Sequence, residues 1–247
     1  MKVLHFILTV GTVLAAVSGF CQSGISIVVP NDLQTVDGDS GSHWPWASGP
    51  MRYQQVFGAS QFQQVAGAGG GWVKGFEVRL DGHDIGSFGR AITNVEIRLS
   101  TTARDPDALS DIFNENIGPD EKLVRTNDVS LLMIRENLPP ELAQPFYGVI
   151  ATDPFFYNPN LGNLLMDIRI FSESPIFLPS DLDSSRVLGD SVSRVVGAIN
   201  SQSGFTVDTD GLVTRFFVEA IPEPSVLSLF VAGIGGGLLV RCWRRRR

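Results

Sequence analysis

Cysteine is almost absent from this sequence. The 247 residues contain two, Cys21 and Cys242, which lie near opposite ends of the chain. A small scaffold held by disulfides needs several paired cysteines, and a structural zinc site needs four ligands of the Cys or His type. The sequence therefore predicts a body stabilised by its apolar core, without a disulfide or a cysteine-based metal cluster.

Histidine is also scarce, which limits the nucleophilic chemistry available. Gly38–Ser42 reads GDSGS, as in the nucleophile loop of chymotrypsin-like proteases, and Gly189–Ser191 reads GDS, as in some lipase-like hydrolases. Both require a histidine base. Apart from His5 the chain has only His43 and His83, and neither precedes the first serine loop or follows the second. We therefore expect ordinary turns rich in Gly, Asp and Ser at both places.

The first residues have the organisation of a secretory signal peptide. Lys2 supplies a positive charge, and a nearly continuous apolar run over Val3–Val17 leads to the small residue Gly19. Cleavage is expected after Gly19, with Ser23 as the alternative. Phe20 before Cys21 departs from the small residue that a lipoprotein signal requires. Residues 1–19 are therefore predicted to direct export.

The other end carries a second apolar run. Val226–Val240 contains no charged residue, and at 1.5 Å per residue it is about 22 Å long, shorter than the ~30 Å core of a bilayer. Five arginines follow it: Arg241, Arg244, Arg245, Arg246 and Arg247. By the positive-inside rule they stop in the cytoplasm, which predicts a short transmembrane helix and an outward-facing body.

A turn motif stands directly before this run. Pro222, Glu223 and Pro224, the apolar run and the arginines together resemble the PEP-CTERM sorting signal of Gram-negative bacteria, over residues 221–247. The resemblance implies that a membrane protease, exosortase, reads the motif and releases or transfers the protein after a transient stay in the inner membrane. It also implies a cell-surface or extracellular-matrix location linked to exopolysaccharide and biofilm. The two prolines hold the motif extended, which suits a segment that a protease must grip.

The body between these ends is acidic. Removing Lys2, Glu223 and the five tail arginines leaves 13 basic side chains against 25 acidic ones, a net charge near −12. Such a surface disfavours nucleic acid and anionic membranes as partners. It would attract divalent cations or repel neighbouring copies in a matrix.

Alternating hydrophobicity predicts strands throughout the body. Val95, Ile97 and Leu99 share one face of a segment whose other face carries Glu96 and Arg98. The other expected strands are Ile25–Val29, Arg52–Phe57, Phe76–Asp81, Lys122–Thr126, Ser130–Ile134, Leu164–Phe171, Val192–Ile199 and Gly211–Ala220, with one short helical turn at Leu109–Asn114. No long amphipathic helix is predicted. The body, residues 20–220, is therefore expected to be an all-β, antiparallel β-sandwich, of which the jelly roll is one form.

Two acidic turns are candidate calcium sites. Asp208 and Asp210 in DTDG, and Asp181 and Asp183 in DLDSS, offer only the oxygen donors that calcium prefers. Neither stretch continues to the distal glutamate of an EF-hand loop, so a solvated turn is the alternative explanation of each.

A separate candidate is aromatic. Trp44 and Trp46 in HWPW present rings that stack on sugars when exposed and pack in the core when buried. The sequence leaves two functional classes open: a non-catalytic matrix or adhesion protein that binds glycan, and a secreted hydrolase acting on polysaccharide through paired carboxylates. The lack of a histidine-based constellation favours the non-catalytic class, with no cofactor other than calcium.

Overall fold

The described part of the chain is mostly β-structure with antiparallel sheets. A computed structural model of the protein describes residues 24–84, 86–139, 142–172, 176–178 and 180–221. Its helices are short: η1 (Asn31–Leu33), η2 (Ala59–Phe62), α1 (Gln63–Ala66) and η3 (Phe113–Asn116). The expected all-β class is confirmed.

Three sheets contain the strands. A four-stranded sheet has the order β1 (Ile25–Val29), β14 (Thr214–Ala220), β4 (Gly71–Arg79), β7 (Phe146–Tyr157). A larger sheet has the order β12 (Thr206–Asp208), β11 (Val192–Gly197), β3 (Met51–Phe57), β8 (Asn163–Ile170), β5 (Phe88–Thr102), β6 (Lys122–Met133), and β9 (Ile176–Leu178) also pairs with β5. A small sheet has the order β13 (Gly211–Leu212), β10 (Leu182–Ser185), β2 (Ser40–Ser42).

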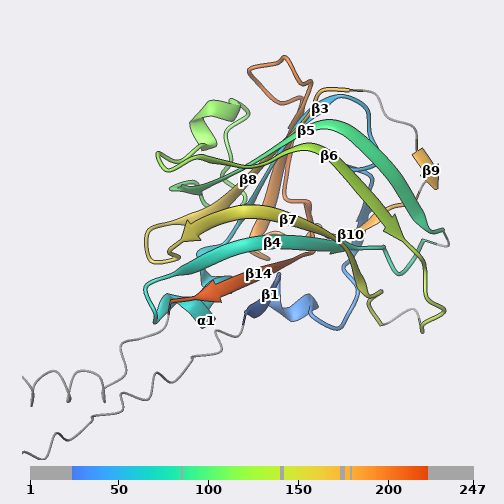
Figure 1. The fold of residues 1–247 in the computed structure, drawn as a ribbon, viewed down its shortest axis with the longest axis horizontal. Coiled ribbons are helices and arrows are strands. Elements are labelled where there is room, and N and C mark those ends of the chain that lie inside the picture. The colour runs from blue at the N-terminus through green and yellow to red at the C-terminus, as the bar shows by residue number, and fades with distance from the viewer. Residues whose placement is uncertain (1–23, 85, 140–141, 173–175, 179, 222–247) are drawn as a thin grey trace, which may run out of the picture.

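The two larger sheets enclose one apolar core. Buried side chains from both contribute to it, among them Phe57 of β3, Phe76 of β4 and Phe216 of β14. The ring of Phe216 meets that of Phe57 edge to face, with centroids 4.8 Å apart. Figure 1 shows β7, β4, β14 and β1 in one layer and β8, β5 and β6 in the other, with β6 and β7 running side by side along one margin.

Most of the expected strands are present, some with different bounds. The alternation at Val95, Ile97 and Leu99 is confirmed, because all three are buried while Glu96 and Arg98 are not. The two segments expected at Lys122–Thr126 and Ser130–Ile134 form the single strand β6. The helical turn expected at Leu109–Asn114 lies later, as η3.

Several strands depart from half-buried alternation: β3 and β11 are buried at every residue, and β4 is buried over its second half. In β4 the residues between the apolar ones, Glu77 and Arg79, are buried as well as Phe76 and Val78. β10 of the small sheet lies against the end of β4, where Leu80 bridges to Leu182. The second face of β4 is therefore covered from Phe76 to Arg79, and the charged residues there need buried partners.

The middle of β4 is irregular in a way that shapes the surface. Pairing with β7 shifts from Val73↔Phe155 to Gly75↔Ala151, which leaves Lys74 opposite the three residues Thr152–Pro154. Pairing with β14 also shifts here. Pro154 cannot donate to a ladder, which an edge strand such as β7 tolerates. Bulges of this kind re-aim side chains and are common beside binding sites.

The two predicted membrane-directed ends lie outside the described residues. These include the signal peptide 1–19, the motif Pro222–Pro224, the apolar run and the arginines. Among the residues that are described, no helix is long and apolar enough to cross a membrane.

Candidate functional site

The structure separates the two tryptophans of the HWPW loop. Trp46 is fully buried in the core, and its carbonyl oxygen accepts a hydrogen bond from Arg90. Trp44 is half-buried and packs against the rings of His43 and Phe205. The indole of Trp46 therefore has no exposed face in this structure. The contact predicted at Trp44 remains a prediction.

The carboxylates of the acidic turn next to Trp44 are paired with arginine side chains. Arg194 of β11 donates to Asp208 at 2.9 Å and to the buried Asp210 at 2.9 Å, and its guanidinium lies 4.9 Å from the centre of the Trp44 ring. Arg186 donates to Asp210 as well, at 3.1 Å. Two guanidinium groups thus neutralise this pair of carboxylates. A calcium ion would have to share Asp208, whose side chain is 35% exposed.

The other acidic turn does not form a joint site. Asp183 is fully buried and accepts from Arg79 Nε at 2.5 Å and from the N–H of Gly38 at 2.8 Å. Burial raises the pKa of Asp183 to about 7, against the opposing effect of Arg79. Asp181 is less buried; burial raises its pKa, and the charge of His43 opposes that rise. Asp183 therefore serves an internal ion pair, and Asp181 alone faces outward.

Calcium binding at these turns is tested by thermal unfolding. We expect calcium to raise Tm more than magnesium does, by the equivalent of about 2.7 kcal/mol at a hundredfold excess over Kd. In the wild type, Asp208 has carboxylate lone pairs that Arg194 does not use and that could bind calcium, so D208N should remove the calcium-induced rise in Tm. D153N changes an exposed aspartate elsewhere and should keep that rise. No shift at millimolar calcium, or an equal shift with magnesium, would leave only an acidic surface.

Ser42 of the first serine loop and Ser191 of the second make hydrogen bonds to other parts of the described chain. Ser42 Oγ accepts from Arg194 at 2.7 Å, and a guanidinium cannot take a proton from a hydroxyl. Ser191 Oγ accepts from the Gln61 amide at 3.2 Å, and its backbone carbonyl accepts from Gly58. These contacts hold the two loops against neighbouring segments.

A further polar group was not visible in the sequence because Asp37 lies far along the chain from Asp81 and His83. His83 Nδ1 lies 2.9 Å from Asp37 and 3.4 Å from Asp81. Both Asp37 oxygens accept from the N–H of Gly82, and burial raises the pKa of Asp37. Two carboxylates and an imidazole are a donor set that a divalent metal would accept. His83 Nδ1 lies close to both carboxylates, so the three side chains also hold one another without a metal.

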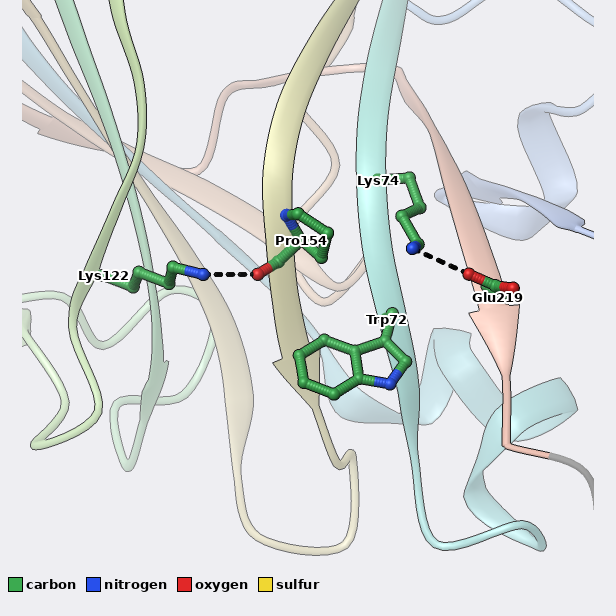
Figure 2. Close-up of a pocket in the computed structure, with 5 residues that line it drawn as sticks. All are labelled: Trp72, Lys74, Lys122, Pro154 and Glu219. Atoms are coloured by element: carbon green, nitrogen blue, oxygen red, sulfur yellow. Dashed lines mark hydrogen bonds and ion pairs between the residues drawn. The ribbon is translucent and has the colours of Figure 1, made fainter.

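A surface groove on the four-stranded sheet was also missed. It is a hollow of about 490 Å³ lined by Trp72, Lys74, Lys122, Pro154 and Glu219. Lys74 and Glu219 form an ion pair at 2.8 Å, and Lys122 Nζ donates to the carbonyl of Pro154 at 2.7 Å. Figure 2 shows the Trp72 indole below Pro154, with Lys122 entering from one side and Lys74 and Glu219 on the other.

Comparisons with known proteins add no assignment to these features. No family model, no curated protein and no solved structure matches the chain.

Proposed function

We propose that this protein is an exported, exosortase-processed protein of the cell surface or extracellular matrix, without catalytic activity, that binds glycan. The observation that carries the proposal is the sequence of three parts at the C-terminal end. Pro222, Glu223 and Pro224 come first, an uncharged apolar run follows, and five arginines come last. After export through the inner membrane, cleavage at the motif would free a compact, acidic β-domain. Exosortase and, transiently, the inner membrane are its partners.

We further propose that the body has jelly-roll topology. The chain passes through β1, β3, β4, β5, β6, β7, β8 and β14, and these strands lie as β1-β14-β4-β7 in one sheet and β3-β8-β5-β6 in the other. In a jelly roll, eight strands form two such four-stranded sheets. Strands β9–β13 then form an insertion before the last strand. This architecture is used by lectin domains, which agrees with a binding role.

The absence of catalysis is supported by how the candidate groups are engaged. Ser42 faces a guanidinium, and Asp183, Asp208 and Asp210 are each paired with arginine. The alternative function, a secreted hydrolase acting on polysaccharide, would need two carboxyl groups across one cleft. Incubating the protein with extracted exopolysaccharide and assaying new reducing ends distinguishes the two, since a binder produces none.

The sorting role is tested at the motif. Replacing Pro222, Glu223 and Pro224 together by alanine should retain the protein in the membrane fraction, because the extended recognition segment is lost. The measurement is the amount and size of the protein in medium and membranes of the producing cells. S225A, which leaves the motif intact, is the matched control. Unchanged release of the triple variant, at the size of the wild type, would contradict the proposal.

A further inference from the structure

Lysine is distributed very unevenly in this protein. Apart from Lys2, the sequence contains only Lys74 and Lys122. They lie 48 positions apart and on different sheets, yet both line the Trp72 groove. With Glu219 opposite them, the groove has a local charge of +1 on a body of net charge near −12. The ammonium group of lysine is compact and sits on a flexible side chain, so it can pair with an anionic group of a ligand that binds from solvent.

The aromatic side chain in the groove is both exposed and supported. Trp72 is 39% exposed, and the ring of Phe156 packs against it with centroids 5.3 Å apart. These residues are directly opposite each other on β4 and β7. Because the neighbouring Phe156 ring restricts the Trp72 indole, the indole loses little entropy on binding. Its flat apolar surface can stack on the C–H face of a sugar ring.

The polar groups around the indole are placed for a carboxylated sugar. Lys74 and Lys122 approach Trp72 from opposite sides, and their present partners are Glu219 and a backbone carbonyl (Figure 2). Both contacts are at the surface and are weak enough to exchange for a carboxylate. Glu219, once released, accepts hydrogen bonds from sugar hydroxyls.

The groove continues along the margin between the two large sheets. A second hollow of about 430 Å³ is lined by Arg125, Thr126 and Asn127 of β6 and by Thr152 and Asp153 of β7. Asp153 is the neighbour of Pro154, and Val124 at its edge is two residues from Lys122. Two adjoining hollows along one seam accommodate successive units of a polymer better than one free sugar.

We propose that the Trp72 groove binds a carboxylated polysaccharide, with the indole stacked on a sugar ring and Lys74 and Lys122 paired with carboxylates. This inference rests on the proposed glycan-binding function and names its site and ligand class. At physiological salt the Debye length is about 8 Å, so negative charges of the body that lie farther than this from the groove oppose such a polymer only weakly. Within the groove the two lysines determine the sign of the interaction.

The test is affinity electrophoresis of the full-length chain in detergent, in native gels containing polygalacturonate or neutral dextran. We expect retardation by polygalacturonate only. W72A should weaken it about tenfold, the loss of one stacking contact. K74Q combined with K122Q should weaken it about tenfold at low salt, and ~1 M salt should have a similar effect on the wild type. The matched controls are F171A, which removes a side chain of similar exposure (40%), and R104Q, which removes a surface cation paired with Glu115.

The outcomes separate the inference from the proposed function. Retardation that survives both groove variants overturns the groove and leaves glycan binding in place. Retardation by neither polymer, nor by exopolysaccharide extracted from the producing cells, overturns glycan binding itself. Equal retardation by dextran overturns the carboxylate specificity. Self-association without polymer that is lost in the lysine variant would assign the groove to a second copy of this acidic chain.

Discussion

Replacing Asp183 by asparagine should cost the protein about 3–5 kcal/mol of folding free energy near pH 8, where the wild-type carboxylate is ionised. Asp183 and Arg79 are both fully buried and joined at 2.5 Å. Asparagine keeps the size of the side chain but removes the charge. Arg79 cannot lose its proton at any accessible pH, so a buried cation would remain without its counterion. Its other contacts, to the carbonyl of Val36 and the ring of Phe146, do not replace a negative charge.

The reverse substitution should behave differently. R79M leaves Asp183 buried without its cation, but a carboxyl group can become neutral. Burial already raises its pKa in the wild type to about 7, and loss of Arg79 raises the pKa further. Because the folded state then holds this proton more tightly than the unfolded chain, stability falls as the pH rises from about 4 through the folded pKa. The deficit of R79M should therefore be small near pH 5 and large near pH 8.

Urea unfolding of the purified variants at about pH 5 and about pH 8 measures both effects. E115Q is the matched control, since it removes one partner of the exposed pair Arg104–Glu115 and should cost at most about 1 kcal/mol. A D183N variant as stable as the wild type would show that the pair contributes no net stability. An R79M deficit of the same size at both pH values would show that Asp183 does not titrate as described.

The sequence predicted the regular strands well because their alternation is local. Val95, Ile97 and Leu99 lie on one face of β5 regardless of which strands pair with it. β7 escaped prediction since Pro154 interrupts it and the bulge breaks its period. Its aromatic residues Phe155 and Tyr157 are nevertheless buried in the core.

The candidate sites were less predictable, because contacts distant in sequence decide them. Asp183 and Asp208 look alike in sequence, yet one lies inside the fold beside Arg79 and the other at a partly open turn beside Arg194. The groove combines side chains of β4, β6, β7 and β14. Its one signal in the sequence was the scarcity of lysine. That signal acquires meaning only when the sheets bring Lys74 and Lys122 to the same hollow.

The two tryptophans of the HWPW loop give the second large expected effect. W46A should destabilise the protein by about 3–5 kcal/mol, since it empties the site of a fully buried indole that the core cannot refill by collapse. W44A should cost about 1 kcal/mol, because Trp44 is half-buried and loses mainly its contacts with Phe205 and the Arg194 guanidinium.

Denaturant unfolding followed by circular dichroism measures both values without relying on the fluorescence of the residues removed. W46F is the control that keeps a ring in the core and should recover part of the loss. Retardation of W44A by polygalacturonate, measured beside W72A, then assigns the glycan contact. If W44A loses binding while W72A keeps it, the sugar sits at the HWPW loop. If W46A is as stable as W44A, Trp46 does not contribute to the core as its complete burial predicts.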